Sequence, residues 1–270
     1  GGVFLAHFLV LRKPVDVSRL YEPASLPALN IAGMAAWIAG FIVYKLAAPI
    51  GATLPALATI NRSGGTVNLV GTLDNAATTF NVGNGTSIGT VTMNGGTIRN
   101  GTVQLNGGTG LVFANANNIL DAVTLHGVLD LSAPSSVVRV FNGLTLLSEA
   151  GTSPGVANVT GSGSALVFQG TQSFNDATIN LGSATTSGNL HNDGTGTLTL
   201  GSGVTVQGRG NIGSQAFVGG AATLINQGTI KANLDGQTLS ISGNGVNTFT
   251  NQGTAQAPAS GSTLSISGAI

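Results

Sequence analysis

The stretch Thr223–Gly243, TLINQGTIKANLDGQTLSISG, decides the fold, because it is written a second time at Thr248–Gly268 as TFTNQGTAQAPASGSTLSISG. The offset between matching positions is constant, and TLSISG at Thr238 recurs unchanged at Thr263. A unit of about 25 residues cannot bury a hydrophobic core alone, so it must stack on copies of itself. The repeat therefore predicts a solenoid.

Each copy alternates apolar and hydroxyl side chains, as in Leu239 and Ile241 between serines. A period of two sends apolar side chains inward and hydroxyls outward on a β-strand. Stacking would place Leu239 over Leu264 at the strand spacing of about 4.8 Å. We therefore expect a mainly β fold, a right-handed parallel β-helix of about eight coils over residues 61–270.

The rest of this region has short β-patterned runs separated by turn formers such as NGG and NANN. Glycine and asparagine tolerate positive φ, so these clusters predict tight corners. Hairpins are the competing interpretation, because Asn-Gly also marks two-residue β-turns. The interval from GLVF, ending at Phe113, to ALVF, ending at Phe168, equals the interval from Asp121 to Asp176, which indicates two coils of unequal length.

Asparagine and phenylalanine recur along the stack. Asn226 and Asn251 would bond through their amides, would occupy left-handed turn positions, or would do both. Asn192, in the phrase LHNDGT, matches the place of Asn226. Stacked rings in the interior are expected for seven phenylalanines: Phe80, Phe113, Phe141, Phe168, Phe174, Phe217 and Phe249.

The composition excludes several functions. The 270 residues include 42 glycines and only 7% charged residues, with no net charge. A neutral chain argues against a nucleic-acid partner, which would need a basic stripe. The absence of cysteine excludes disulfides and thiolate metal sites and is compatible with a secreted bacterial surface protein.

Residues 1–60 read as a different protein from the repeats. An apolar helix end at 1–11, a charged loop at 12–30 and an apolar helix at about 31–50 predict a membrane segment. A buried helix of a soluble domain is the alternative, and a cleaved signal peptide fits poorly. Arg12, Lys13 and Arg19 would keep the loop cytoplasmic, so that residue 61 emerges on the far side of the membrane.

Two motifs in this segment, FLAHFLVLRKPVDVSRLYEP and AAWIAGFIVYKLAAPIGATLPAL, resemble the late part of a nucleobase:cation symporter of the cytosine, purine and allantoin permease family. That family usually has an acidic residue where this chain has Ala6 or His7. The resemblance implies no binding residue here, because the family's substrate helices lie in parts that this chain lacks. A vestige, a gene fusion or a mis-joined reading frame would each explain it.

The motifs NGGTI, INQGTI and GQTLSISG resemble the β-strand-repeat passenger regions of bacterial autotransporters and filamentous adhesins. The resemblance extends over most of the region that follows residue 60. It implies a cell-surface or extracellular protein that contacts host glycans, matrix or neighbouring cells, with residues 1–50 in a membrane.

Residues that could take part in catalysis or metal binding are few. Asp121, Asp130 and His126 form the tightest group, and a polysaccharide lyase would need them to converge with an arginine in one groove. His191 beside Asp193 is a weaker pair. Three histidines far apart do not suggest a metal site, and Thr-x-Thr steps would need three coils in register to form a flat threonine array. We therefore predict no catalytic, cofactor or metal residue.

The leading hypothesis is a non-enzymatic surface scaffold, an adhesin or autotransporter passenger. The alternatives are a non-functional permease fragment fused to a repeat region, and a β-helix that binds or cleaves polysaccharide.

Overall fold

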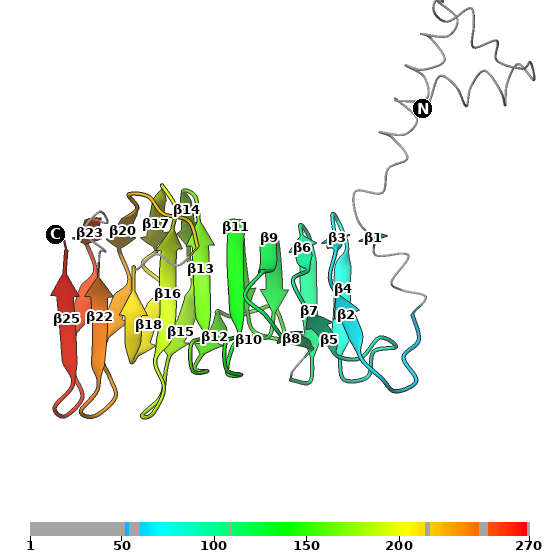
Figure 1. Cartoon of the computed structure of the whole chain (residues 1–270), viewed down its shortest axis with the longest axis horizontal. Helices are drawn as coiled ribbons and strands as arrows, with labels where there is room; N and C mark the ends of the chain where they lie inside the picture. The colour runs from blue at the N-terminus through cyan, green and yellow to red at the C-terminus, as the bar shows by residue number, and fades with distance from the viewer. Residues whose placement is uncertain (1–51, 54–59, 109, 214–216, 243–247, 269–270) are drawn as a thin grey trace, which may run out of the picture. The chain divides into compact units, whose positions relative to one another are not determined.

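The computed structural model describes residues 52–53, 60–108, 110–213, 217–242 and 248–268. Within them the chain winds into a β-solenoid of about eight coils, and every ladder between strands is parallel (Figure 1). The predicted stack of coils is confirmed, and the hairpin interpretation is wrong for these residues. The predicted helix at about 31–50 lies outside the described residues. In the part that is described, no helix has the length and apolarity needed to span a membrane.

Each coil has three faces, with one strand on each face in most coils and one long strand, β9 or β11, on two faces in the middle coils. The first face holds the longest run of paired strands, in the order β1-β3-β6-β9-β11-β13-β16-β19-β22-β25. Their bounds are β1 Ala52–Thr53, β3 Thr72–Asp74, β6 Thr97–Arg99, β9 Asn118–His126, β11 Val137–Leu147, β13 Ala165–Gln169, β16 Gly188–Asp193, β19 Gly210–Ile212, β22 Thr238–Ser242 and β25 Thr263–Ser267.

The second face is interrupted. β9 and β11 are long enough to turn the corner, so their later residues continue the ladder of β4 and β7 on this face. A separate sheet, β14-β17-β20-β23, then follows. The bounds are β4 Thr79–Gly83, β7 Thr102–Asn106, β14 Gln172–Phe174, β17 Thr197–Leu200, β20 Thr223–Asn226 and β23 Thr248–Asn251.

The third face is also built from two sheets, β2-β5-β8 and β10-β12-β15-β18-β21-β24. The bounds are β2 Val67–Leu69, β5 Val91–Met93, β8 Leu111–Phe113, β10 Val128–Asp130, β12 Gly155–Val159, β15 Ala177–Leu181, β18 Thr205–Gly208, β21 Thr229–Lys231 and β24 Thr254–Gln256.

The repeat that decided the fold is in strict register. Leu239 pairs with Leu264, as predicted, and Asn226 pairs with Asn251. Asn226 is buried and donates from Nδ2 to Asn251 Oδ1 at 2.7 Å. Neither asparagine is among the residues with positive φ, so the amide ladder is confirmed and the left-handed turn interpretation is wrong for this pair.

Elsewhere the coil length varies, and two alignments drawn from the sequence are wrong. On the first face Asn118 pairs with Val138 and Gly210 pairs with Leu239, and the second pair spans a longer stretch of chain because extra residues lie in corner loops. Two predicted columns therefore fail. Phe113 lies on the third face and Phe168 on the first, and Asn192 pairs with Phe168 in β13 rather than standing under Asn226.

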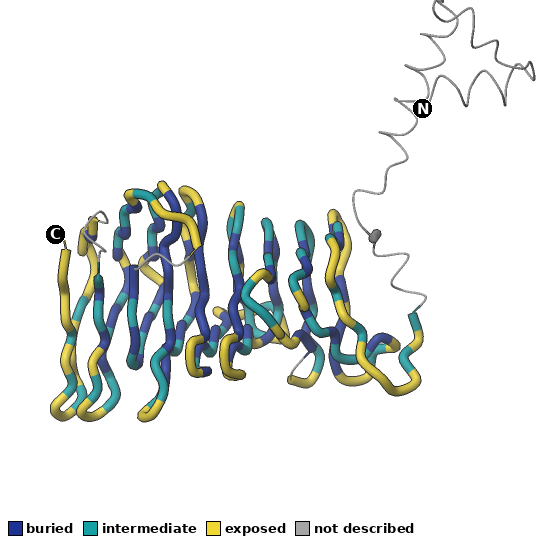
Figure 2. The backbone as a smooth tube through the Cα atoms, in the orientation of Figure 1, coloured by how far each residue is buried: buried dark blue, intermediate teal, exposed yellow. Residues whose placement is uncertain are grey.

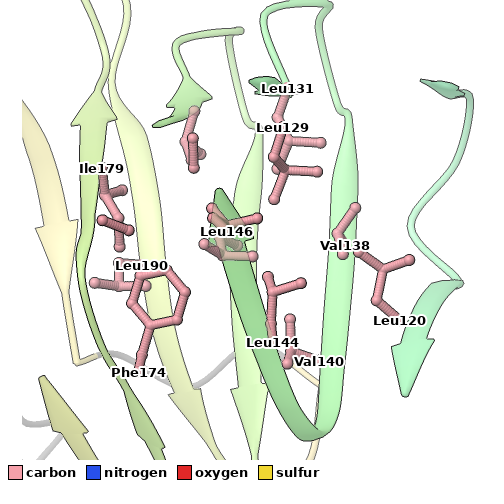
Figure 3. Close-up of a cluster of buried hydrophobic side chains, with 14 of the residues drawn as sticks. Leu120, Leu129, Leu131, Val138, Val140, Leu144, Leu146, Phe174, Ile179 and Leu190 are labelled. Carbon is pink, nitrogen blue, oxygen red and sulfur yellow. The ribbon is translucent and has the colours of Figure 1, made fainter. Parts of the chain in front are cut away.

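Inward-pointing aliphatic side chains form one continuous core. Figure 2 shows that buried residues recur along the strands of every coil, while exposed residues gather at many of the turns. Figure 3 shows the middle coils, where Leu129, Leu146 and Leu190 project into the interior. Each fully buried leucine stabilises the fold by roughly 1.5–3 kcal/mol relative to an exposed one. Because like residues lie over like, neighbouring coils supply the contacts that a single coil lacks.

Five of the seven phenylalanines are in this core, with the rings of Phe168 and Phe174 5.1 Å apart. The expectation was wrong for Phe141 and Phe217. Phe141 pairs with Asp121 at an outward position of β11, and Phe217 lies on a loop with 40% of its surface exposed. Alternation along a strand decides which ring is inside, whatever the spacing between rings.

Candidate functional site

The three residues weighed for polysaccharide cleavage do not meet. Asp121 lies on the first face and accepts a hydrogen bond from Asn142 Nδ2 at 2.6 Å. His126 is beyond the corner on the second face, with Nδ1 3.1 Å from Gln104 Oε1. Asp130 is on the third face, where its carboxylate accepts the N–H of Ser132. The convergence that a lyase requires is not formed by this group.

His191 and Asp193 are alternate residues on the outer side of β16, and both are buried. Asp193 holds a loop: Oδ2 accepts the main-chain N–H of Phe217 at 3.1 Å and of Val218 at 3.0 Å. Gln169 donates a third hydrogen bond to the same carboxylate, at 3.0 Å. The pair predicted as a weak catalytic candidate therefore includes a residue that fixes the loop over the first face.

An arginine lies between two aromatic rings beside this loop. The guanidinium carbon of Arg139 is 5.5 Å from the ring centre of Phe141 and 5.3 Å from that of Phe217. Arg139 Nη2 also donates to Gln169 Oε1 at 2.8 Å. Cation–π contacts of this kind contribute roughly 0.5–2 kcal/mol. They fasten the loop to β11, and no sequence pattern signals them, because Phe217 is far from Phe141 along the chain.

The first coils carry an ion pair on the first face. Arg99 Nη2 is 2.8 Å from Asp74 Oδ2, and both side chains are partly exposed. Hydrogen bonds from the side chains of Asn100 and then Arg99 lower the pKa of Asp74 below its ordinary value. Asp121 follows Arg99 in the same ladder, so acidic and basic residues alternate along this column.

The third face carries a column of three amides, with Asp130 before it and Lys231 after it in the same ladder. Asn180 donates to Asn158 Oδ1 at 2.8 Å, and Gln207 donates to Asn180 Oδ1 at 2.8 Å. Four threonines of the third face stand in another column, namely Thr178, Thr205, Thr229 and Thr254. On the second face Ile225 stands between Thr199 and Thr250, so three Thr-x-Thr steps in register are not formed there.

A groove of about 440 Å³ opens where the second face is interrupted. It is lined by Ala122–Thr124, by Asn142–Leu147 and by Ser173, Asn175 and Asp176. Sequence reasoning missed it, because the strands that flank it have ordinary β patterns. Three of its non-glycine residues have positive φ, with values of 54° at Ala122, 52° at Asn142 and 49° at Asp176. Asn and Asp favour this conformation, so the sequence carried a partial signal at the last two positions and none at Ala122.

Left-handed backbone is unfavourable by roughly 1–2 kcal/mol at a residue such as Ala122 and persists there only where the surrounding structure fixes it, whereas Asn and Asp adopt it more readily. Ala122 and Asn142 turn the corner between the first and second faces in β9 and β11, and the register of these two strands shifts between Phe141 and Leu144. Asp176 precedes β15 on the next coil. The groove is therefore a built feature of the fold.

No group of three or more potential metal ligands occurs among the residues that the structure describes. No family model, no curated protein and no solved structure matches the chain. The features that bear on function are therefore the surface columns, the groove and the contact of Arg139 with Phe141 and Phe217, which we name the arginine clamp.

Proposed function

We propose that the chain is a non-enzymatic scaffold of the cell surface or extracellular space, similar in role to an autotransporter passenger or filamentous adhesin. In this proposal the coils wind right-handed, as parallel crossovers almost always do. Residues 1–50 hold the chain in a membrane through their apolar sequence. The solenoid is a rigid rod that contacts glycans, matrix or neighbouring cells.

The observation that carries the proposal is the polar, sparsely charged surface of the later coils. From residue 194 onward the sequence contains only three charged residues, Arg209, Lys231 and Asp235. Amide side chains of Asn158, Asn180 and Gln207 bond to one another along the stack, which holds them in fixed positions. Such columns offer donors and acceptors at a regular spacing of about 4.8 Å, which suits neutral, hydroxyl-rich ligands better than charged ones.

Surface exposure is the first test. The full chain, with an epitope tag after Ile270, would be expressed in bacteria and intact cells treated with protease. We expect the tag to be lost from intact cells, while a cytoplasmic control protein survives. A tag that is digested only after lysis would contradict the surface location and favour a fused permease fragment.

Adhesion is the second part of the same test. Cells that display the chain should bind a panel of glycan- and matrix-coated surfaces better than cells that display a variant with Asn180→Ala and Gln207→Ala. The matched control is Gln227→Ala, an exposed amide on a different column. Equal binding by all three would show that the amide column is not the contact surface.

A further inference from the structure

Five asparagine–glycine steps lie in the part of the chain that the structure describes. They begin at Asn84, Asn94, Asn100, Asn106 and Asn142, and a sixth, at Asn244, lies outside the described residues. At such a step the main-chain nitrogen of the glycine can attack the side-chain amide carbon of the asparagine, because glycine has no side chain that hinders the approach. The attack needs an asparagine side chain that is free to turn and a glycine N–H that is not held by an acceptor.

The step at Asn106 shows how the fold prevents this attack. Asn106 Nδ2 donates to the carbonyl oxygen of Val82 at 3.2 Å, which fixes the side chain. The N–H of Gly107 donates to Glu149 Oε1 at 2.8 Å, which directs the nitrogen toward the carboxylate instead. A reaction here would first have to break both hydrogen bonds, and each of them adds to the barrier.

Three other steps are restrained in a similar way. Those at Asn94 and Asn142 are held at the side chain and at the glycine nitrogen, and the one at Asn100 is held at the side chain. The contacts are Asn115 Nδ2 to Asn94 Oδ1 at 2.8 Å, Gly95 N to Asn118 Oδ1 at 2.9 Å, Asn142 Nδ2 to Asp121 Oδ1 at 2.6 Å, Gly143 N to Gln172 Oε1 at 3.1 Å, and Asn100 Nδ2 to Asp74 Oδ1 at 3.1 Å.

Asn84 is the exception. It is exposed at the corner that follows β4, and Gly85 beside it is exposed as well, with φ at 76°. Among the described residues, neither the Asn84 side chain nor the N–H of Gly85 makes a hydrogen bond. The turn is held at its ends, where the N–H and Oγ1 of Thr86 donate to Gly83 O at 3.3 Å and 2.8 Å. Both reacting groups therefore face solvent without a restraint of their own.

We propose that Asn84 is a site of spontaneous modification, at which the amide is lost and a carboxylate is formed. The nitrogen of Gly85 bonds to Cγ of Asn84, the bond from Cγ to Nδ2 breaks, and ammonia leaves with the proton from Gly85. Water then opens the resulting cyclic imide at either carbonyl carbon, which yields aspartate or isoaspartate. Water is the co-reactant, and nothing is oxidised or reduced. This inference goes beyond a scaffold role and does not depend on it.

The new charge would appear close to an existing carboxylate. Gly107 packs against Asn84, since a Cβ at position 107 would lie 3.1 Å from the Cβ of Asn84. The N–H of Gly107 donates to Glu149 Oε1, and the carbonyl oxygen of Glu149 accepts from Gln104 Nε2 at 2.9 Å. These two bonds hold the loop that follows β11 against β7. Because like charges repel, modification of Asn84 weakens the contact between Glu149 and Gly107.

The test follows all five steps in one sample. The full chain, purified in detergent, would be kept in mildly alkaline buffer and sampled over time by proteolysis and mass spectrometry, with chromatography to separate aspartate from isoaspartate. We expect Asn84 to lose its amide, and to lose it faster at higher pH because the attacking nitrogen must give up its proton. The other four steps should react at least about tenfold more slowly.

The denatured chain is the matched control. Urea removes the hydrogen bonds that restrain the other four steps, so their rates should approach that of Asn84. In the folded protein, Asn84→Gln should stop the reaction at this position, because attack on the longer side chain would have to close a larger ring. The same variant should leave the other four steps as they were, and circular dichroism would establish that its coils are intact.

Asn84→Asp tests the effect on the loop directly, because it introduces the charge without the reaction. Hydrogen exchange at the Gly107 amide, corrected for the intrinsic rate, should become about two- to fivefold faster, as expected for repulsion between exposed groups. Asn84→Gln, which adds no charge, should leave this exchange unchanged.

Three results would overturn the proposal. The first is a folded chain that loses the amides of Asn106 or Asn142 as fast as that of Asn84. The second is a difference between the steps that persists in urea, because its cause would then be the neighbouring residues and not the fold. The third is unchanged exchange at Gly107 in the Asn84→Asp variant, which would remove the effect on Glu149.

Discussion

The coils before the groove and the coils after it stack different kinds of polar side chain on their surfaces. In the first coils the outward column of the first face is charged, with Arg99 paired to Asp74 and followed by Asp121. In the last coils the second-face column is neutral, and Asn226 bonds to Asn251. Both arrangements place a donor over an acceptor at the spacing of paired strands, which is what a stack of parallel coils requires.

The two regions also differ in regularity. The pairs β20–β23, β21–β24 and β22–β25 all share one offset along the chain, whereas the offset changes from one pair of strands to the next in the middle coils. Equal spacing lets all three faces stay paired. At the groove the first face stays paired through β11 and β13, but the second face does not. A change in coil length is therefore absorbed on one face at a time.

The largest expected effect comes from breaking the regular coils at their core. Leu239 is fully buried between Gly210 and Leu264, whereas Leu264 is only partly buried. Leu239→Ala should lower the free energy of unfolding by about 2–5 kcal/mol, since it leaves a cavity. Leu264→Ala should lower it by no more than about half of that, because less apolar area is involved. Urea denaturation of the two variants measures the difference.

A result in which both leucines matter equally would mean that the last described coil is as well covered as the one before it. A result in which neither matters would contradict the core position of Leu239.

A smaller effect is expected from the neutral ladder. Asn226 donates to Asn251 Oδ1 and to Thr254 O, and it accepts from Gly228 N. Asn226→Ala would leave buried main-chain groups without partners and should lower the free energy of unfolding by about 1–3 kcal/mol. Gln227→Ala, which removes the neighbouring exposed amide pair, should change it by less than about 0.5 kcal/mol. Equal losses would show that burial of the ladder contributes nothing.

The regular region is also the part that could be predicted. The repeat at Thr223 and Thr248 predicts the stack, the register of Leu239 over Leu264 and the Asn226 ladder, because identical spacing permits one alignment. The middle coils have no identical phrases. There the interval between Phe113 and Phe168 led to a wrong alignment of two strands, because strands on different faces share the same alternating pattern.

The groove and the arginine clamp were beyond prediction for a related reason. The corner at Ala122 depends on left-handed backbone, yet alanine carries no sequence signal for it, unlike glycine or asparagine. Arg139, Phe141 and Phe217 meet only because a loop folds back over the first face. Contacts set by loop conformation are not encoded in the periodicity from which coils are inferred.

The smallest effect sharpens the contrast between charged and neutral columns. Because hydrogen bonds from Asn100 and Arg99 lower the pKa of Asp74, its ionised form stabilises the folded state. This stabilisation is present above the ordinary pKa of an aspartate and is lost as the pH falls through the lower pKa of the folded state, so the window lies below about pH 4. The effect should be modest, since the side chains of Arg99 and Asp74 are 29% and 28% exposed and salt screens them.

Hydrogen exchange measured coil by coil can separate the two regions. On acidification, protection of amides in β3 and β6 should fall, after correction for the intrinsic rate, while protection in β22 and β25 stays constant. Asp74→Asn should remove the pH dependence from the first coils and leave the last coils unaffected. If the last coils lost protection in the same window, the acid sensitivity would belong to the whole stack, and the charged column would not be its source.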